Sequence, residues 1–137
     1  MLVRRGEPSD LDAISAIQTA SPEAAQWRPA DYLHYDLQVA ASDSRVLGFL
    51  VTRTPAPGES EILNLAVAPE CRRQGVARTL IQAWMRGIAG DIFLEVRASN
   101  LTAQKFYKSL GFQEFVARPE YYAFPLETGI VMKFHSC

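Results

Sequence analysis

A short basic turn opens a helical pattern at residues 68 to 81, "APECRRQGVARTLI". The N-terminus of a helix carries unpaired N–H groups and a partial positive charge. The small residues Gly75 and Ala77 would let an anion approach those N–H groups closely. Further positive charge comes from Arg72, Arg73 and Arg78. The stretch predicts a phosphate-binding turn, although it lacks the Gly-Lys-Ser/Thr ending of a P-loop. The alternative is an ordinary helix start with surface arginines.

Two further side chains could move protons. Glu95 lies in the otherwise apolar strand pattern "DIFLEV", where burial would raise its pKa toward that of a useful base. The alternative is an ion pair with Arg97, two residues on and on the same strand face. Tyr107, on the helical pattern "TAQKFYKSLGF", has a phenol that could donate a proton or could simply pack in the core. Cys71, near a helix start, is a candidate nucleophile for a covalent route.

The elements that must position these residues follow from the hydrophobic periodicity. Strand patterns cover residues 1–5, 45–54, 61–68, 91–96, 112–117 and 129–135. Helical patterns cover 8–20 (with Ser9 or Asp10 as N-cap), 29–38, the stripe from Ala77 to Ile88 and 99–112. An irregular segment rich in Tyr and Pro separates the last two strands. This order predicts a mixed sheet with helices on its faces, in a single domain of residues 1–137.

The composition excludes several classes of partner. The chain has 48% hydrophobic residues, and 14 Lys+Arg against 15 Asp+Glu give a net charge of −1, which does not favour nucleic acid. Two cysteines make no disulfide framework and fit a reducing compartment. No apolar run approaches the roughly 20 residues that span a bilayer, and no signal peptide is evident. We expect a soluble cytoplasmic protein without a membrane partner and, because His34 and His135 lack companion ligands, without a metal.

Three motifs resemble those of known acetyltransferases. "RRQGVA" resembles the Arg/Gln-x-x-Gly-x-Gly/Ala signature of the GNAT superfamily, and "LNLAVAPE" is similar to its pantetheine-binding strand. "FLEVRASNLTAQKFYKSLGF" resembles the RimI family, which acetylates the N-terminal alanine of a small-subunit ribosomal protein. The match extends from about residue 61 to residue 116. The resemblance implies the α/β (α+β) GNAT fold, with a central mixed, mostly antiparallel sheet flanked by helices on both faces.

The resemblance also implies roles for individual residues. Glu95 would be the general base and Tyr107 the general acid, and Asn100 would hydrogen-bond acetyl-CoA near its pantetheine. The backbone that would pair with the pantetheine arm belongs to Leu65, Ala66 and Val67. The turn that would hold the pyrophosphate comprises Arg73, Gln74, Gly75, Val76, Ala77 and Arg78. The aromatic side chains that would line the acceptor site are Trp27, Tyr121 and Tyr122. Where the family pattern has an acidic pair before the last strand, this chain has Glu127 followed by Thr128.

The resulting hypothesis is an enzyme that transfers acetyl from acetyl-CoA to the N-terminal α-amine of a protein or peptide, such as a ribosomal protein, in a direct ternary complex. One alternative is an acetyltransferase for a small amine or a lysine side chain. Another is a catalytically silent domain that binds acyl-CoA and regulates a partner. The presence of both Glu95 and Tyr107 speaks against silence, because a silent domain needs neither. The sequence does not fix the acceptor or the oligomeric state.

Overall fold

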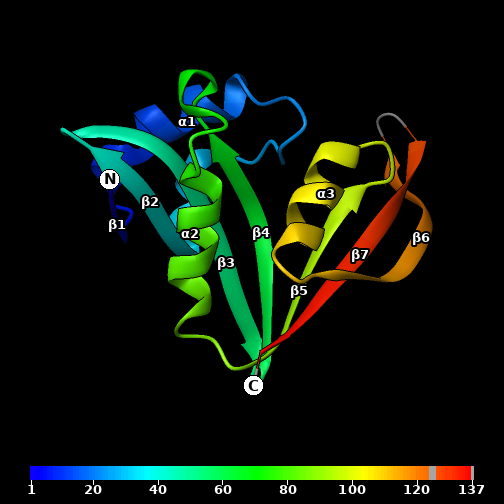
Figure 1. The fold of residues 1–137 in the computed structure, drawn as a ribbon. Coiled ribbons are helices and arrows are strands. Elements are labelled where there is room, and N and C mark those ends of the chain that lie inside the picture. Colours follow the sequence, from blue (N-terminus) through cyan, green and yellow to red (C-terminus); the bar gives the residue numbers. More distant parts are fainter. Residues whose placement is uncertain (124–125, 137) are drawn as a thin grey trace. The chain divides into compact units, whose positions relative to one another are not determined.

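The structure, a computed structural model, describes residues 1–123 and 126–136. Within these ranges, seven strands form one mixed, mostly antiparallel sheet in the order β1-β2-β3-β4-β5-β7-β6 (Figure 1). The strands are β1 Leu2–Arg5, β2 Asp36–Ser42, β3 Arg45–Ala56, β4 Glu59–Val67, β5 Gly90–Arg97, β6 Gln113–Ala123 and β7 Leu126–Ser136. The helices are α1 Leu11–Thr19, α2 Val76–Met85 and α3 Leu101–Ser109, with 3-10 turns η1 Pro8–Asp10, η2 Pro29–His34 and η3 Pro69–Cys71. None of the helices in the described ranges combines the length and apolar character needed to cross a bilayer.

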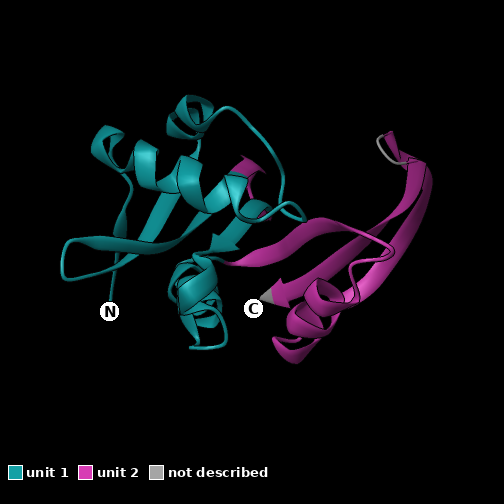
Figure 2. Ribbon diagram, turned by 90° about the horizontal axis from the view of Figure 1, so that it is seen from above, with its two compact units in different colours: residues 1–53, 62–88 teal, residues 54–61, 89–137 magenta. Residues whose placement is uncertain are grey.

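The chain forms two compact units (Figure 2). Unit 1 comprises residues 1–53 and 62–88, and unit 2 comprises residues 54–61 and 89–137. In unit 1, β1, β2 and β3 pair in antiparallel fashion. In unit 2, the beginning of β4 pairs in parallel with β5, and β7 lies between β5 and β6 in antiparallel fashion.

The helical elements of unit 1 cover both faces of its strands. Phe49 of β3 packs against Tyr32 of η2, with 5.6 Å between ring centroids. Its neighbour Gly48 points to the other face, where an added Cβ would lie 3.2 Å from Cγ1 of Val76 in α2 and 2.9 Å from the carbonyl oxygen of Ala66. Glycine at position 48 therefore lets β3, β4 and α2 approach closely. This part of the fold agrees with the sequence prediction of helices on both faces.

The helix α3 of unit 2 covers one face of β5 and β7. The rings of Tyr107, Phe112 and Phe134 form a chain with centroid distances of 5.5 and 5.4 Å. Phe134 is paired with the buried Ile92 and so shares its face of the sheet. Because side chains alternate along a strand, Glu95 of β5 points to the opposite face.

Two segments differ from the sequence prediction. The helix expected over 29–38 ends as the 3-10 turn η2 at His34, and β2 follows from Asp36. Gln38 pairs with Leu50 of β3, while Leu37 and Val39 are buried, so strand pairing decided the conformation rather than local propensity. The segment expected to be irregular between the last strands is instead largely strand, since β6 extends to Ala123 and β7 begins at Leu126.

The start of α1 is held by Asp10, which was expected as an N-cap. Asp10 stands at the N-cap position but makes no side-chain hydrogen bond to the helix. Its buried carboxylate instead accepts hydrogen bonds from Nη1 and Nη2 of Arg4 at 2.8 and 2.9 Å and from the backbone N–H of Glu7 at 2.8 Å. The Arg4 bonds, followed by the Glu7 amide, hold the pKa of Asp10 below its ordinary value.

We expect Asp10→Asn to lower the free energy of unfolding by about 1 to 3 kcal/mol at neutral pH, the range for hydrogen bonds to charged groups. Because the pKa of Asp10 is lowered in the folded state, its contribution is complete above the unfolded value of about 3.9 and is lost as the pH falls through the folded value. Urea denaturation of both proteins at pH 7 and at about pH 3 measures this difference. If the two proteins differed in unfolding free energy by the same amount at both pH values, the assigned role of the Asp10 carboxylate would be contradicted.

Candidate active site

The turn before α2 has the backbone shape of an anion cradle. Gly75 is the N-cap residue with φ 80°, and Arg73 is also left-handed with φ 63°. A Cβ added at Gly75 would meet no atom within 4 Å, so the space before the turn is open. Thr79 N donates to the Gly75 carbonyl oxygen at 3.0 Å, and the three N–H groups between them precede this first helical bond. The turn therefore fits a bound anion such as a pyrophosphate.

Arg72 does not belong to this cradle, contrary to the expectation that it adds charge there. Its Nε donates to the carbonyl oxygen of Val67 at 3.2 Å. Its Nη2 donates to Ala20 O at 3.1 Å and to Ser21 Oγ at 2.8 Å. Arg72 thus ties the end of β4 to the loop after α1. The side chain of Arg73 is exposed, so it is the nearer source of charge for the turn.

The strand expected to bind pantetheine is anchored by a buried amide that the sequence analysis missed. Oδ1 of Asn64 accepts a hydrogen bond from Leu65 N at 3.0 Å. Nδ2 of Asn64 donates to Ala25 O at 2.9 Å and to the Tyr32 hydroxyl at 2.8 Å. Trp27 stacks on Tyr32 with 5.8 Å between centroids, so Asn64 links β4 to the loop that carries Trp27. A polar residue in an apolar strand was the signal that could have identified it.

Glu95 is a largely buried carboxylate, its side chain 17% exposed. Its Oε1 accepts a hydrogen bond from Nη1 of Arg118 at 3.2 Å. Its Oε2 is buried and has no hydrogen-bond partner among the described residues. Burial raises the pKa of Glu95, and Arg118 opposes that rise. The alternative pairing with Arg97 is wrong, since Arg97 pairs with Glu127 at 3.3 Å.

Tyr121 and Tyr122 lie beside Glu95 in unit 2. The guanidinium of Arg118 lies 4.2 Å from the ring centroid of Tyr121, and that of Arg97 lies 4.3 Å from that of Tyr122. The two rings meet edge to face with 5.0 Å between centroids. Burial, followed by the negative charge of Glu95, raises the pKa of Tyr122 to about 12, so its phenol is neutral at ordinary pH.

Gly129 of β7 provides the room for this cluster. A Cβ added at Gly129 would overlap Oε2 of Glu95 and would lie 3.0 Å from Cδ2 of Tyr121. Only glycine therefore permits the observed positions of both side chains. The sequence analysis placed Gly129 at the start of a strand but could not assign this role, because the contact joins residues far apart in the chain.

Tyr107 lies on the other face of unit 2 from Glu95. Its side chain is 6% exposed and packs edge to face against Phe106 and Phe112, with 5.1 and 5.5 Å between centroids. Burial raises the pKa of the phenol well above its usual value. The phenol is therefore protonated at ordinary pH, as a proton donor must be. The two residues expected to handle protons thus lie on opposite faces of one set of strands.

Asn100 caps α3, because its Oδ1 accepts a hydrogen bond from Ala103 N at 3.1 Å. Glu127 supports the same helix start by accepting from Ser99 N. The Ser99 bonds, followed by Arg97, hold the pKa of Glu127 below its ordinary value. Because Oδ1 is used in the cap, the expected hydrogen bond from Asn100 to acetyl-CoA would be donated by Nδ2. This contact stays a prediction.

Cys71 is buried, with 5% of its surface exposed, and it lies in the short turn η3 of unit 1. A thiol in this setting is poorly placed to receive an acyl group, which weakens the covalent alternative. In the described part of the chain, no three His, Cys, Asp or Glu side chains gather as a metal site would require.

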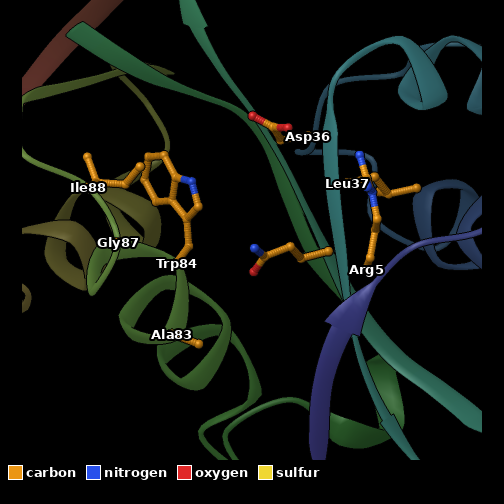
Figure 3. A pocket seen from close by; sticks show the side chains of 8 residues that line it. Arg5, Asp36, Leu37, Ala83, Trp84, Gly87 and Ile88 are labelled. Carbon is orange, nitrogen blue, oxygen red and sulfur yellow. The ribbon is translucent and has the colours of Figure 1, made fainter. Parts of the chain in front are cut away.

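A surface cavity of about 410 Å³ lies at the opposite end of α2 from the anion turn (Figure 3). Trp84 and Ile88 line it from the end of α2 and the segment that follows, and Arg5 and Gln38 line it from β1 and β2. No predicted site residue contributes to it. The cavity is therefore separate from the anion turn of the same unit.

Comparison with known proteins identifies the family. The profile described as the Acetyltransferase (GNAT) family matches residues 10–112. The [ribosomal protein bS18]-alanine N-acetyltransferase of Escherichia coli K12 is 36% identical over 96 residues, which cover 66% of this chain and 62% of the relative. An uncharacterized N-acetyltransferase of Methanocaldococcus jannaschii is 32% identical over 135 residues, covering 89% and 84% of the two chains. The crystal structure of Ard1 from Thermoplasma volcanium superposes with a TM-score of 0.90 at 26% identity, covering 99% and 97%.

The chain therefore belongs to the GNAT acetyltransferase family. Its fold is the GNAT fold that the motifs predicted. The alignment spans less than two thirds of the Escherichia coli relative's length.

We expect Gly75→Glu to abolish measurable acetyl-CoA binding, because it adds bulk and negative charge where the pyrophosphate would lie. Gly58→Glu is a matched control. Gly58 also has a left-handed backbone, with φ 76°, and a Cβ added there would meet no atom within 4 Å. Calorimetric titration with acetyl-CoA measures both variants. Equal affinity of folded Gly75→Glu and of wild type would remove the anion-cradle assignment.

We expect Tyr107→Phe to lower the rate constant of acetyl transfer by about 10² to 10⁴, the usual contribution of a general acid. The ring and its contacts with Phe106 and Phe112 remain, so the variant should fold like wild type. Single-turnover kinetics at saturating acetyl-CoA measure the chemical step. An unchanged rate constant would rule out the acid role.

Proposed function

We propose that the protein is an acetyl-CoA-dependent N-acetyltransferase that acts on the N-terminal α-amine of a protein or peptide. The observation that carries this proposal is the carboxylate of Glu95, whose buried Oε2 lacks a partner among the described residues and lies beside Gly129. In a member of the GNAT family, such an oxygen is suited to take a proton from an attacking amine.

The reaction can be written from the residues of this chain. Acetyl-CoA supplies the acetyl group as a thioester. Glu95 takes one proton from the ammonium form of the acceptor, the neutral amine nitrogen then attacks the carbonyl carbon, and its second proton passes to water. The C–S bond breaks, and the phenol of Tyr107 donates its proton to the departing thiolate. Because Glu95 and Tyr107 lie on opposite faces of the strands, this step requires the thioester to lie where the amine reaches Glu95 from one face and the sulfur reaches Tyr107 from the other. The N–H groups of the turn from Arg73 to Arg78 hold the pyrophosphate throughout.

The difference in pKa between the two candidate amines supports an α-amine as the acceptor. An α-amine has a pKa of about 8 and a lysine amine one of about 10.4, so the free-base fraction at pH 7 is roughly two hundred times larger for the α-amine. A single carboxylate then has much less deprotonation to perform. Arg118 opposes the rise in the pKa of Glu95 and so favours the ionised carboxylate that a base requires.

The aromatic residues support an extended peptide as acceptor. Tyr121 is 45% exposed, and its ring is fixed by Arg118 and Tyr122. Within unit 1, Trp27 lies on a loop anchored through Asn64, and its ring stacks on that of Tyr32. The name of the Escherichia coli relative supports a ribosomal protein beginning with alanine as the acceptor.

We expect a peptide that begins with free Ala to be acetylated in preference to the same peptide blocked at its N-terminus and carrying an internal Lys. Competition between the two with labelled acetyl-CoA, read by mass spectrometry, measures the preference. Preferential modification of the internal lysine would contradict the α-amine acceptor and favour the lysine alternative. Acetyl-CoA binding without transfer to either peptide would favour a silent regulatory domain.

A further inference from the structure

Arg118 reaches Glu95 diagonally across β7. Arg118 of β6 pairs with Gly129 of β7, which in turn pairs with Arg97 of β5. Glu95 lies in the neighbouring row, opposite Val131. Because Gly129 has no side chain, the guanidinium of Arg118 can pass over β7 to the carboxylate.

The contact between Arg118 and Glu95 is built to be reversible. Arg118 keeps 53% of its side chain exposed, and the structure gives it a 3.2 Å contact with Oε1 of Glu95 and a stack on the ring of Tyr121. An exposed guanidinium loses little interaction free energy when it exchanges such a partner for water. The second carboxylate oxygen, Oε2, is buried beside it without a hydrogen-bond partner among the described residues.

The neighbouring ion pair is fixed more firmly. Arg97 and Glu127 have only 28% and 17% of their side chains exposed. Glu127 also accepts a hydrogen bond from Ser99 N at the start of α3, and Arg97 lies over the ring of Tyr122. Of the two arginines on this face, Arg118 is therefore the one that can move away from its carboxylate.

Resting on the proposed function, we propose that Arg118 is a displaceable counter-ion of Glu95, whose guanidinium holds the place that the ammonium group of the acceptor takes on binding. The ammonium group carries the same charge as the guanidinium and brings N–H donors for both carboxylate oxygens. An acceptor without a positive charge could not replace Arg118 in this way. Arg118 is thus a positioning residue that competes with a cationic amine for the carboxylate of Glu95.

The charges that face Glu95 give the expected sign of a titration. Among the described residues, Arg118 and Tyr121 approach from β6 and Gly129 from β7, and the phenol of Tyr122 lies close enough to sense the charge of Glu95. The positive charge of Arg118 lowers the pKa of Glu95 and so opposes the effect of burial. Removal of that charge should raise the pKa of Glu95 and keep the carboxyl protonated to higher pH.

The test compares Arg118→Ala and Arg118→Gln with wild type and with Arg86→Ala, which removes an exposed arginine at the end of α2. The first measurement is a carbon-13 NMR titration of glutamate carboxyl groups without substrates, in which Glu95→Gln assigns the Glu95 signal. The second is kcat/KM and KM for a free-Ala peptide as functions of pH. We expect the Glu95 titration and the acid limb of kcat/KM to move to higher pH in both Arg118 variants and to stay in place in Arg86→Ala.

At pH values above the acid limb, we expect the KM for the peptide to fall about twofold to fivefold in the Arg118 variants, because the peptide no longer competes with an exposed ion pair. A purely structural role of Arg118 would not combine a lower KM at high pH with a lower activity at low pH. An unshifted Glu95 titration in an active enzyme, or a KM that does not fall, would overturn this proposal alone. A shifted titration in a protein that acetylates no peptide would overturn the proposed function and, with it, displacement by an acceptor.

Discussion

Glu95 places a carboxylate on a strand whose neighbours are mostly apolar, and the side chains on the face of unit 2 opposite to α3 are arranged around it. A buried carboxylate is costly unless it is paired or hydrogen-bonded. Here a glycine on β7 leaves room for the group, and an arginine on β6 compensates its charge. The three neighbouring strands thus each supply one part of this arrangement: β5 carries Glu95, β7 carries the glycine and β6 carries the arginine.

The two tyrosines of this face lie at the last bulge of β6. The register between β6 and β7 shifts between Arg118 and Tyr122, and Glu120 adopts a left-handed conformation with φ 56° within that shift. A bulge of this kind turns side chains away from the strict alternation of a regular strand. Tyr121 and Tyr122 consequently meet edge to face, and each offers its ring to a different arginine.

Local signals were enough to predict much of the fold and one half of the candidate site. Strand β4, the turn from Arg73 to Arg78 and helix α2 follow one another directly in the sequence. The glycine of the turn and the hydrophobic periodicity on either side of it were therefore enough to predict all three. Strand β2 was missed because its conformation depends on pairing with β3, and the length of β6 was missed because it depends on β7. The partner of Glu95 could not be predicted either, since Arg118 and Gly129 lie 23 and 34 positions away and only the sheet brings them close. The assignment of Arg72 to the anion turn failed for a similar reason, because its partners Ala20 and Ser21 belong to a distant loop.

The interruptions of β6 also bear on association between copies of the protein. β6 forms one border of the sheet, and an eleven-residue border strand with exposed Phe115 and Val116 is a ready template for a second chain. Its pairing with β7 is continuous for at most three residues, from Val116 to Arg118, before the register changes. A foreign strand would meet the same breaks and could not extend a regular ladder of hydrogen bonds along the whole border. The irregularity that orients the tyrosines therefore also makes this border a poor template for edge-to-edge aggregation.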